Sequence, residues 1–202
     1  MSARHYARTM PFADLAAALA DAVRDGAVNA RRCAARPGLV LYVYSQRCVY
    51  ENLWTPVIET ARGLVLDHDA GRVLATPFPK FFNLGERPGA LPDEPFEALD
   101  KLDGSLGVVY HDGEGWRCST KGGFESAQAQ WAQRWLDARD LSPLTIGTTY
   151  CFEIIYSANR IVVRYPFEGL VLLAAYDEAG EERSRVDLLL SLIHISEPTR
   201  PY

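Results

Sequence analysis

A short string at Lys101–Ser105, with the sequence KLDGS, has the composition of a site for covalent catalysis. A lysine acts as a nucleophile only after its amine loses a proton, which is rare at neutral pH because its ordinary pKa is about 10.4. Burial or neighbouring cations lower that pKa, and lysine shifts readily. Asp103 could orient the lysine or a sugar hydroxyl, and Gly104 lets backbone approach a nucleotide closely. The same residue types are common in solvated turns, so the string alone leaves both interpretations open.

A single carboxylate, Glu153, interrupts the strongly apolar run Tyr150–Tyr156. Burying a carboxylate in a strand costs free energy unless it has a partner, so a role in a site is favoured over a chance position. No metal cage of protein side chains is predicted, because ligand-like spacing is absent among His5, His68, His111 and His194.

The lysine string immediately precedes one of two predicted β-hairpins. Each hairpin consists of two short apolar runs joined by a turn rich in Asp and Gly, residue types that tight turns favour. The first hairpin is predicted from Gly63–Leu66 and Arg72–Ala75, joined by Asp67–Gly71, and the second from Leu106–Tyr110 and Trp116–Ser119, joined by His111–Gly115. The elements that must position the lysine string are therefore strands and their turns.

Further β-rich runs outnumber the helical patterns. They are Leu39–Tyr50, Thr148–Tyr156, Ile161–Val163 and Leu170–Tyr176. Four-residue spacing predicts helices over Pro11–Asp25 and Phe124–Ala138, the latter with Trp131 and Trp135 as core residues rather than base-stacking ones. The proline- and glycine-rich stretch Pro77–Pro95 is predicted to be a loop. Because hairpins dominate over strand–helix–strand spacing, the sequence predicts an α+β domain built on antiparallel sheets.

The composition excludes several classes of protein. With 202 residues, 48% of them hydrophobic and 23% charged, the chain can bury one core and is not a disordered polypeptide. It has neither a membrane-spanning apolar run nor the apolar core of a secretory signal. The four cysteines show no CxxC or zinc-like spacing, so a reduced, cytoplasmic protein is predicted. Neither a membrane nor a protein partner is predicted. A net charge of −5 argues against a general nucleic-acid coat protein but allows a local basic groove.

Five blocks in order make the sequence resemble the bacteriophage T4 RNA ligase 1 family, a branch of the covalent lysine nucleotidyltransferases. The lysine string matches the KxDG motif that RNA ligases, DNA ligases and mRNA capping enzymes share. The other blocks are Ala61–Leu66 (ARGLVL), Pro79–Glu86 (PKFFNLGE), Ser119–Gly123 (STKGG) and Phe152–Val163 (FEIIY followed by NRIVV). The KFFNLGE string is not expected in DNA ligases or capping enzymes. The resemblance covers roughly residues 40–185 and implies an antiparallel-sheet nucleotidyltransferase domain, the ATP-grasp-like adenylation domain of a ligase.

The resemblance implies a role for each matched residue. Lys101 attacks the α-phosphorus of ATP to form lysyl-AMP, the AMP passes to an RNA 5′-phosphate, and a 3′-hydroxyl displaces it to seal the strand. Arg62 and Lys80 are expected to bind the triphosphate, although an exposed arginine and a lysine lying along an apolar edge are the plain alternatives. Mg²⁺ is expected to neutralise phosphate charge. The other expected nucleotide-pocket residues are Asp103, Gly104, Lys121, Phe152 near the adenine, and Glu153 on the ribose.

Two downstream motifs of the family are not found where its pattern requires them. Glu168–Val171 (EGLV) looks like the metal-binding motif IV, but Leu170–Ala175 fits the strand that precedes this motif, so Glu168 is not predicted to bind metal. The paired lysines of motif V are missing. From Leu190 onward the sequence LSLIHISEPTR resembles the translation of a transposon-based sequencing-library adapter. We therefore expect residues 1–189 to be the N-terminal part of an adenylation domain, incomplete at its C-terminus, and residues 190–202 to be a non-native tail.

The sequence thus predicts an ATP-dependent RNA ligase that joins RNA 5′-phosphate and 3′-hydroxyl ends in RNA repair, with tRNA among the candidate substrates. Strand sealing by the chain as it stands is expected to be weak or absent. One alternative is another lysine nucleotidyltransferase, of the DNA ligase or capping type, which nucleotide choice and end preference would distinguish. A second alternative is a non-catalytic relative that binds nucleotide or RNA ends.

Overall fold

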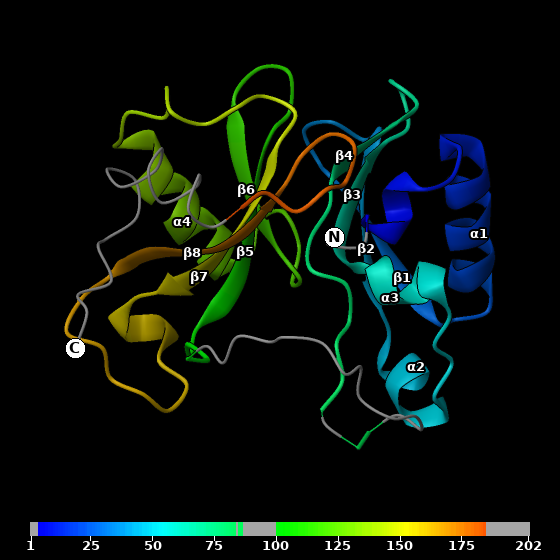
Figure 1. Ribbon diagram of the computed structural model, residues 1–202, viewed down its shortest axis with the longest axis horizontal. Coiled ribbons are helices and arrows are strands. Elements are labelled where there is room, and N and C mark those ends of the chain that lie inside the picture. Colours follow the sequence, from blue (N-terminus) through cyan, green and yellow to red (C-terminus); the bar gives the residue numbers. More distant parts are fainter. Residues whose placement is uncertain (1–3, 84, 87–99, 185–202) are drawn as a thin grey trace.

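A computed structural model describes residues 4–83, 85–86 and 100–184, which form four layers in the order helices, sheet, sheet, helix (Figure 1). The far part of the predicted loop Pro77–Pro95 and Leu84 of the KFFNLGE block lie outside the described residues. The predicted tail 190–202 also lies outside them.

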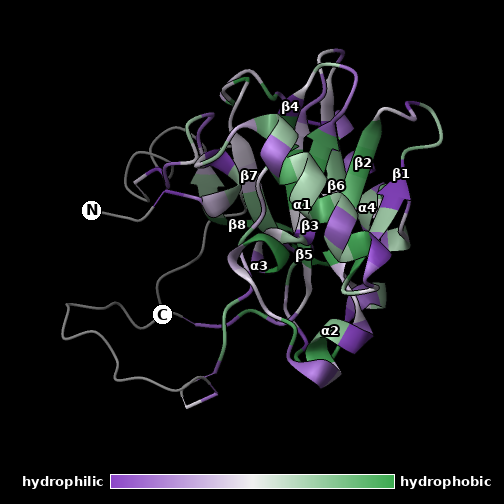
Figure 2. Cartoon of the chain, turned by 90° about the vertical axis from the view of Figure 1, so that its right-hand side faces the viewer, coloured by the Kyte–Doolittle hydropathy of each residue, from purple (hydrophilic) through white to green (hydrophobic). Residues whose placement is uncertain are grey.

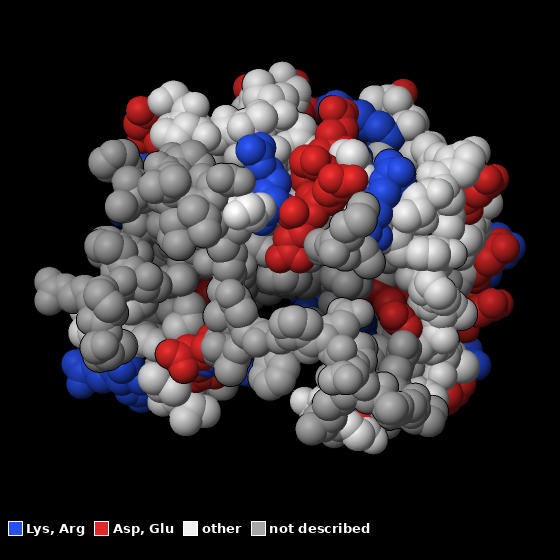
Figure 3. Space-filling view, in the orientation of Figure 1, with Lys and Arg blue, Asp and Glu red and all other residues white. Residues whose placement is uncertain are grey.

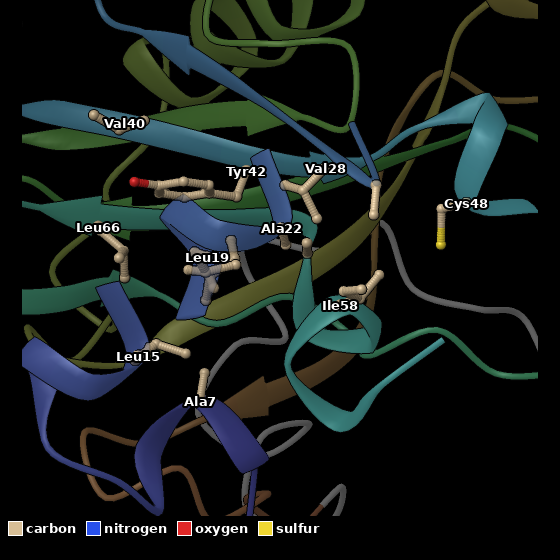
Figure 4. Packing of buried hydrophobic residues seen from close by; sticks show 13 residues of the cluster. Ala7, Leu15, Leu19, Ala22, Val28, Val40, Tyr42, Cys48, Ile58 and Leu66 are labelled. Carbon is tan, nitrogen blue, oxygen red and sulfur yellow. The ribbon is translucent and has the colours of Figure 1, made fainter. Parts of the chain in front are cut away.

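The outer layer on one side is formed mainly by α1 (Phe12–Arg24), which confirms the predicted helix. Leu15 and Leu19 are fully buried, and burial of a leucine side chain contributes about 1.5–3 kcal/mol. The helix ends where Gly26 takes a positive φ of 71°, a conformation that glycine adopts without strain. Figure 4 shows these leucines packed with side chains of the neighbouring sheet and of the short helix α3 (Pro56–Thr60).

The first sheet has the order β1 (Val28–Arg32), β2 (Leu39–Tyr44), β3 (Arg62–Asp67) and β4 (Arg72–Ala75), with all neighbours antiparallel. The predicted hairpin β3–β4 is confirmed, whereas β1 and α3 were not predicted. Edge strand β1 is polar along most of its length, while its neighbour β2 is apolar (Figure 2).

The predicted strand Leu39–Tyr50 was wrong beyond Tyr44. The hydroxyl of Ser45 accepts a hydrogen bond from the Cys48 amide at 3.0 Å, which caps α2 (Gln46–Glu51) and turns the chain out of the sheet. A capping serine in the middle of an apolar run is a weak local signal beside the β-rich residues that precede it.

The second sheet has the order β6 (Trp116–Thr120), β5 (Ser105–His111), β7 (Thr149–Ile155) and β8 (Gly169–Tyr176), again antiparallel throughout. The predicted hairpin β5–β6 and strands β7 and β8 are confirmed. The predicted helix Phe124–Ala138 is confirmed as α4 (Ala127–Asp137), which begins three residues later because Ser126 caps it.

The predicted strand Ile161–Val163 was wrong. These residues are exposed and lie in irregular structure between the 3₁₀ turn η2 (Ser157–Asn159) and β8. The amides of Val162 and Val163 donate to the Asp103 carboxylate instead of to a neighbouring strand. A side chain distant in sequence therefore overrides the β preference of this apolar run.

The two sheets pack face to face. Inner-face residues of β2 and β3, including Leu41 and Val65, contact Val108 and Tyr110 of β5. The outer face of the first sheet packs on α1 and α3, and that of the second sheet packs on α4, where Trp135 is buried and Trp131 lies against the core as predicted. The α+β class with antiparallel sheets is confirmed. Within the described ranges, no helix is long and apolar enough to cross a membrane.

Residues 4–8, which include the 3₁₀ turn η1 (Tyr6–Arg8), hold the two sheets together at one end. The His5 amide donates to the Gly180 carbonyl at 2.8 Å, and its Nε2 lies 2.9 Å from the Pro77 carbonyl oxygen. Burial lowers the pKa of His5 to about 4, although the hydrogen bond to Pro77 opposes this shift. His5 therefore links the segment after β4, through its imidazole, to the turn after β8, through its backbone amide.

Candidate active site

The lysine string runs into β5 beside the end of β7. Gly104 donates its amide to Glu153 Oε1 at 2.8 Å. A Cβ at Gly104 would lie 2.5 Å from the Ile154 carbonyl oxygen, a separation that real Cβ atoms do not show. Gly104 is therefore required where the strand carrying Glu153 passes the lysine string, and Lys101 lies exposed three residues before it.

Asp103 is tied to the segment that follows η2. Its Oδ2 accepts hydrogen bonds from the amides of Val162 and Val163 at 2.7 and 2.9 Å, and its own amide donates to the Tyr165 hydroxyl at 2.8 Å. The two amides lower the pKa of Asp103, and the charge of Lys101 adds to this effect. Asp103 is thus a carboxylate that fixes one loop to the lysine string.

Asn159 forms a second link between the same segments. Its Oδ1 accepts hydrogen bonds from Ser105 Oγ at 3.1 Å and from Gln128 Nε2 at 3.3 Å, and its Nδ2 donates to the Ile154 carbonyl at 2.9 Å. The asparagine is buried, so these bonds satisfy a side chain that would otherwise be costly to enclose. It joins η2, β5, β7 and α4 around the base of the lysine string.

Glu153 is the half-buried carboxylate at the centre of this arrangement. Burial raises its pKa above the ordinary value, although the Gly104 amide and the charges of Lys101 and Arg62 act in the opposite direction. The charges of both cations therefore act on Glu153, Lys101 from the lysine string and Arg62 from the other sheet. The predicted residues Arg62, Lys101, Asp103, Gly104 and Glu153 come together where the two sheets meet.

Three cations of the site rest against aromatic rings. The guanidinium of Arg62 lies 4.5 Å from the ring centre of Phe81, and Lys121 Nζ lies 4.1 Å from that of Tyr44. Lys80 Nζ lies 4.2 Å from the ring centre of Phe82. The backbone of Lys121 also passes close to Gly63 of β3, because a Cβ on Gly63 would lie 3.7 Å from the Lys121 backbone nitrogen. These contacts bring Lys80 and Lys121 to the same end of the sheets as Arg62.

The chain contains only three lysines, Lys80, Lys101 and Lys121, among 21 basic residues of the Lys and Arg types. All three lie in this site together with Arg62, while the remaining Lys and Arg residues of the chain are all arginines. An ammonium group is a compact point charge that can also lose its proton, which a guanidinium cannot do at physiological pH. The three lysines are therefore the described basic side chains of this site that could lose a proton at physiological pH.

Phe152, which was predicted to lie near the adenine, is not brought into the cluster, and neither is Glu168, which was not predicted to bind metal. Phe152 is fully buried and packs with Trp135 and Leu136 beneath α4, on the face of the sheet opposite Glu153. Glu168 is exposed and accepts a hydrogen bond from the Ser157 amide at 2.7 Å; its interactions with Ser157 lower its pKa. Among residues 4–83, 85–86 and 100–184, no three His, Cys, Asp or Glu side chains gather as a metal site.

Sequence reasoning missed Tyr44, Trp54 and Tyr165. Tyr44 ends a strand, Trp54 lies in the short connection between α2 and α3, and Tyr165 follows the NRIVV block. Their partners lie far away in the chain, so no local pattern marks them. The scarcity of lysine is a signal that could have linked Lys80, Lys101 and Lys121 before the structure was known.

The fold and site define an α+β protein in which two antiparallel sheets hold a lysine string next to a carboxylate and a set of cations. A profile of the RNA ligase family that includes T4 RNA ligase 1 matches residues 60–185. This chain belongs to that family.

Two curated relatives agree with this assignment. The chain is 32% identical over 134 residues to a protein of Thermovibrio ammonificans named "Putative RNA ligase", covering 61% of this chain and 35% of the relative. It is 25% identical over 186 residues to an RNA ligase of Rhodothermus phage RM378, covering 70% of this chain and 42% of the relative. The matches therefore span less than half the length of either relative.

Proposed function

We propose that the chain carries the nucleotide-transfer step of an ATP-dependent RNA ligase, with Lys101 as the nucleophile and residues 1–189 as the N-terminal part of the adenylation domain. The observation that carries this proposal is the junction of Lys101, Gly104, Glu153 and Arg62 at the meeting point of the two sheets. Family membership supplies the class of reaction, and the site supplies the residues for it.

In the proposed step, the neutral amine of Lys101 attacks the α-phosphorus of ATP. The new bond joins Nζ to phosphorus, the bond to the departing oxygen breaks, and pyrophosphate leaves with that electron pair. The amine gives up its remaining extra proton to solvent, so the product is a phosphoramidate of AMP. Arg62, Lys80 and Lys121 supply the positive charge that the triphosphate and the departing pyrophosphate require.

Glu153 and Gly104 fit the nucleoside half of the substrate. Glu153 is held in place by the Gly104 amide, and its other carboxylate oxygen can accept a hydrogen bond from a ribose hydroxyl. The missing side chain at Gly104 leaves the backbone open to close approach. Phe152 is left out of this proposal because it is buried on the other face of the sheet.

Asp103, with its lowered pKa, and the neighbouring Glu153 are the described carboxylates that could act on a divalent cation or its water ligands. Mg²⁺, when bound with the nucleotide, would neutralise phosphate charge. Asp103 already accepts two backbone amides through Oδ2, so only Oδ1 is free of these bonds.

RNA ends are the proposed acceptor, with tRNA among the candidates. On the face in Figure 3, acidic side chains gather in the upper middle with basic ones on both sides, so this face offers RNA no continuous basic surface. With a net charge of −5, RNA binding would depend on the cations of the site. Sealing by this chain is expected to be weak or absent, because the sequence shows no motif V lysine pair.

The test is incubation with α-³²P-ATP and Mg²⁺, followed by a denaturing gel and peptide mapping. With three lysines in the chain, a labelled peptide identifies the modified residue directly. We expect label at Lys101 that disappears in Lys101→Ala, with ATP preferred over GTP. If the chain is not labelled, the same assay on a gene extended past Leu189 decides, and a folded but unlabelled product there would refute the proposal.

A further inference from the structure

An aromatic row supports the cations of the site. The ring of Trp54 meets the ring of Tyr44 edge to face, with centres 5.0 Å apart, and the ring of Phe82 in the same way at 5.4 Å. Trp54 is the middle member of this row. Because edge-to-face contacts fix both separation and tilt, each ring restrains the next.

The row presents ring faces to two lysines from different parts of the chain. Lys121 lies over Tyr44 at one end, and Lys80 lies over Phe82 at the other, with its Nζ also 5.8 Å from the centre of Trp54. The three rings come from the end of β2, the α2–α3 connection and the segment after β4. One row thus couples the positions of two long, flexible side chains.

Ring faces leave a lysine available in a way that a carboxylate does not. A carboxylate partner would occupy the N–H donors and cancel the charge, whereas a ring attracts the ammonium by its quadrupole without accepting a strong hydrogen bond. Acidic competitors are present: Glu86 is 4.0 Å from Lys80, and Glu153 and Asp103 lie beside the lysine string. Lys80 Nζ also donates to the Phe81 carbonyl oxygen, so Glu86, at the outer limit of an ion pair, offsets its charge only in part, and the rings leave the rest for a polyanion.

We propose that Trp54 is a positioning residue for polyphosphate binding: it locks Tyr44 and Phe82 so that Lys80 and Lys121 are held over their ring faces, in place for the phosphates of the nucleotide. This inference rests on the proposed function for the identity of the ligand. It assigns Trp54 no contact with the nucleotide; the residue acts through the two lysines.

The test measures binding of inorganic tripolyphosphate to the full 202-residue chain by isothermal titration calorimetry. Trp54→Leu removes the ring and is expected to raise Kd about tenfold, which is about 1.4 kcal/mol. Trp54→Phe keeps a ring and should bind within about threefold of the parent. Tyr50→Leu is the matched control, because Tyr50 is 84% exposed on neighbouring α2, and it should bind as the parent does.

A double-mutant cycle separates positioning from general loss of structure. If Trp54 acts through the two lysines, Trp54→Leu should weaken binding by less than about twofold when Lys80→Met and Lys121→Met, taken together as one change, are already present. Additive losses in the cycle, failure of Trp54→Phe to restore binding, or parent-like binding by Trp54→Leu would each overturn the proposal.

The outcomes also distinguish this inference from the proposed function. A chain that binds tripolyphosphate through Trp54 but never carries label at Lys101, even when extended, would retain the inference and refute the nucleotide-transfer step. A chain that is labelled at Lys101 but binds tripolyphosphate equally well with and without the Trp54 ring would support the nucleotide-transfer step and refute the inference about Trp54. A parent chain that does not bind tripolyphosphate would refute the inference together with the proposed polyphosphate site.

Discussion

At the scale of single residues, Gly104 is confined by the Glu153 carboxylate on its amide and by the Ile154 carbonyl oxygen in the space a side chain would need. Neither atom can move away easily, because the oxygen belongs to the backbone of β7 and the carboxylate is half-buried. A substitution at Gly104 therefore tests whether the position of the lysine string relative to β7 affects the reaction of Lys101.

Gly104→Ala is expected to lower the rate of labelling at Lys101 by at least about tenfold and to destabilise the fold by about 1–3 kcal/mol, since the new Cβ forces the lysine string away from β7. Single-turnover labelling and urea unfolding measure the two effects. Gly115→Ala is the control, because its Cβ would meet only Arg117 side-chain atoms at 3.8 Å or more. Equal labelling by the two variants would contradict the steric argument.

Which site residues could be predicted depended on whether the signal was local. Lys101, Asp103 and Gly104 lie in one contiguous string, and the family resemblance added Arg62 and Lys80. In the structure these five residues lie at the same end of the two sheets. Phe152 shows the limit of such reasoning. A motif gives the position of a residue in the chain, whereas the face of the strand on which its side chain lies depends on the register and packing of the whole sheet.

At the scale of elements, η2 and the segment after it are held by side chains rather than by a strand ladder. Asn159 links η2 to β5, β7 and α4, and Asp103 accepts the amides of Val162 and Val163. The sequence suggested a strand here because three β-branched residues are adjacent. Hairpins and the two long helices were predictable because their signals are periodic and contiguous; this segment depends on distant partners.

Asn159→Ala is expected to cost about 1–3 kcal/mol of stability, because it leaves the buried Ile154 carbonyl and the Ser105 hydroxyl without this partner. It should also increase hydrogen exchange in the segment 160–168 more than elsewhere. Urea unfolding and exchange mass spectrometry measure these effects. Asn29→Ala on the exposed edge strand β1 should change stability by less than about 0.5 kcal/mol. A uniform increase in exchange over the whole chain would show that Asn159 does not act on this segment in particular.

At the scale of the whole molecule, the four layers bring Arg62 of one sheet to Glu153 of the other, so neither sheet contains the candidate site alone. The sequence predicted the α+β class and most strands but not their division into two sheets. That division depends on which apolar faces meet, and the strands buried on both faces carry no alternation to reveal it.

His5 should make the stability of this arrangement depend on pH. Its pKa is about 4 in the folded protein and about 6.5 in an unfolded chain, so only the unfolded state takes up the proton between these values. Stability is therefore fully present above about pH 6.5 and falls as the pH drops toward 4, by about 3 kcal/mol in total. Urea unfolding at pH 7 and pH 4.5 should show this loss for the parent and a smaller one for His5→Gln. Identical profiles would mean that another group sets the dependence.

The strand orders also set the order in which the layers can be assembled during synthesis. In the first sheet, neighbours in space are neighbours in the chain, so β1–β4 can pair as soon as Ala75 has left the ribosome. The second sheet must wait, because β7 returns past α4 to pair with β5. The segment around His5 emerges before either sheet, yet its partner Gly180 follows β8. A nascent chain therefore cannot complete the contacts of His5 until β8 and Gly180 have been made, and protection of that imidazole reports that the ends of the two sheets have come together.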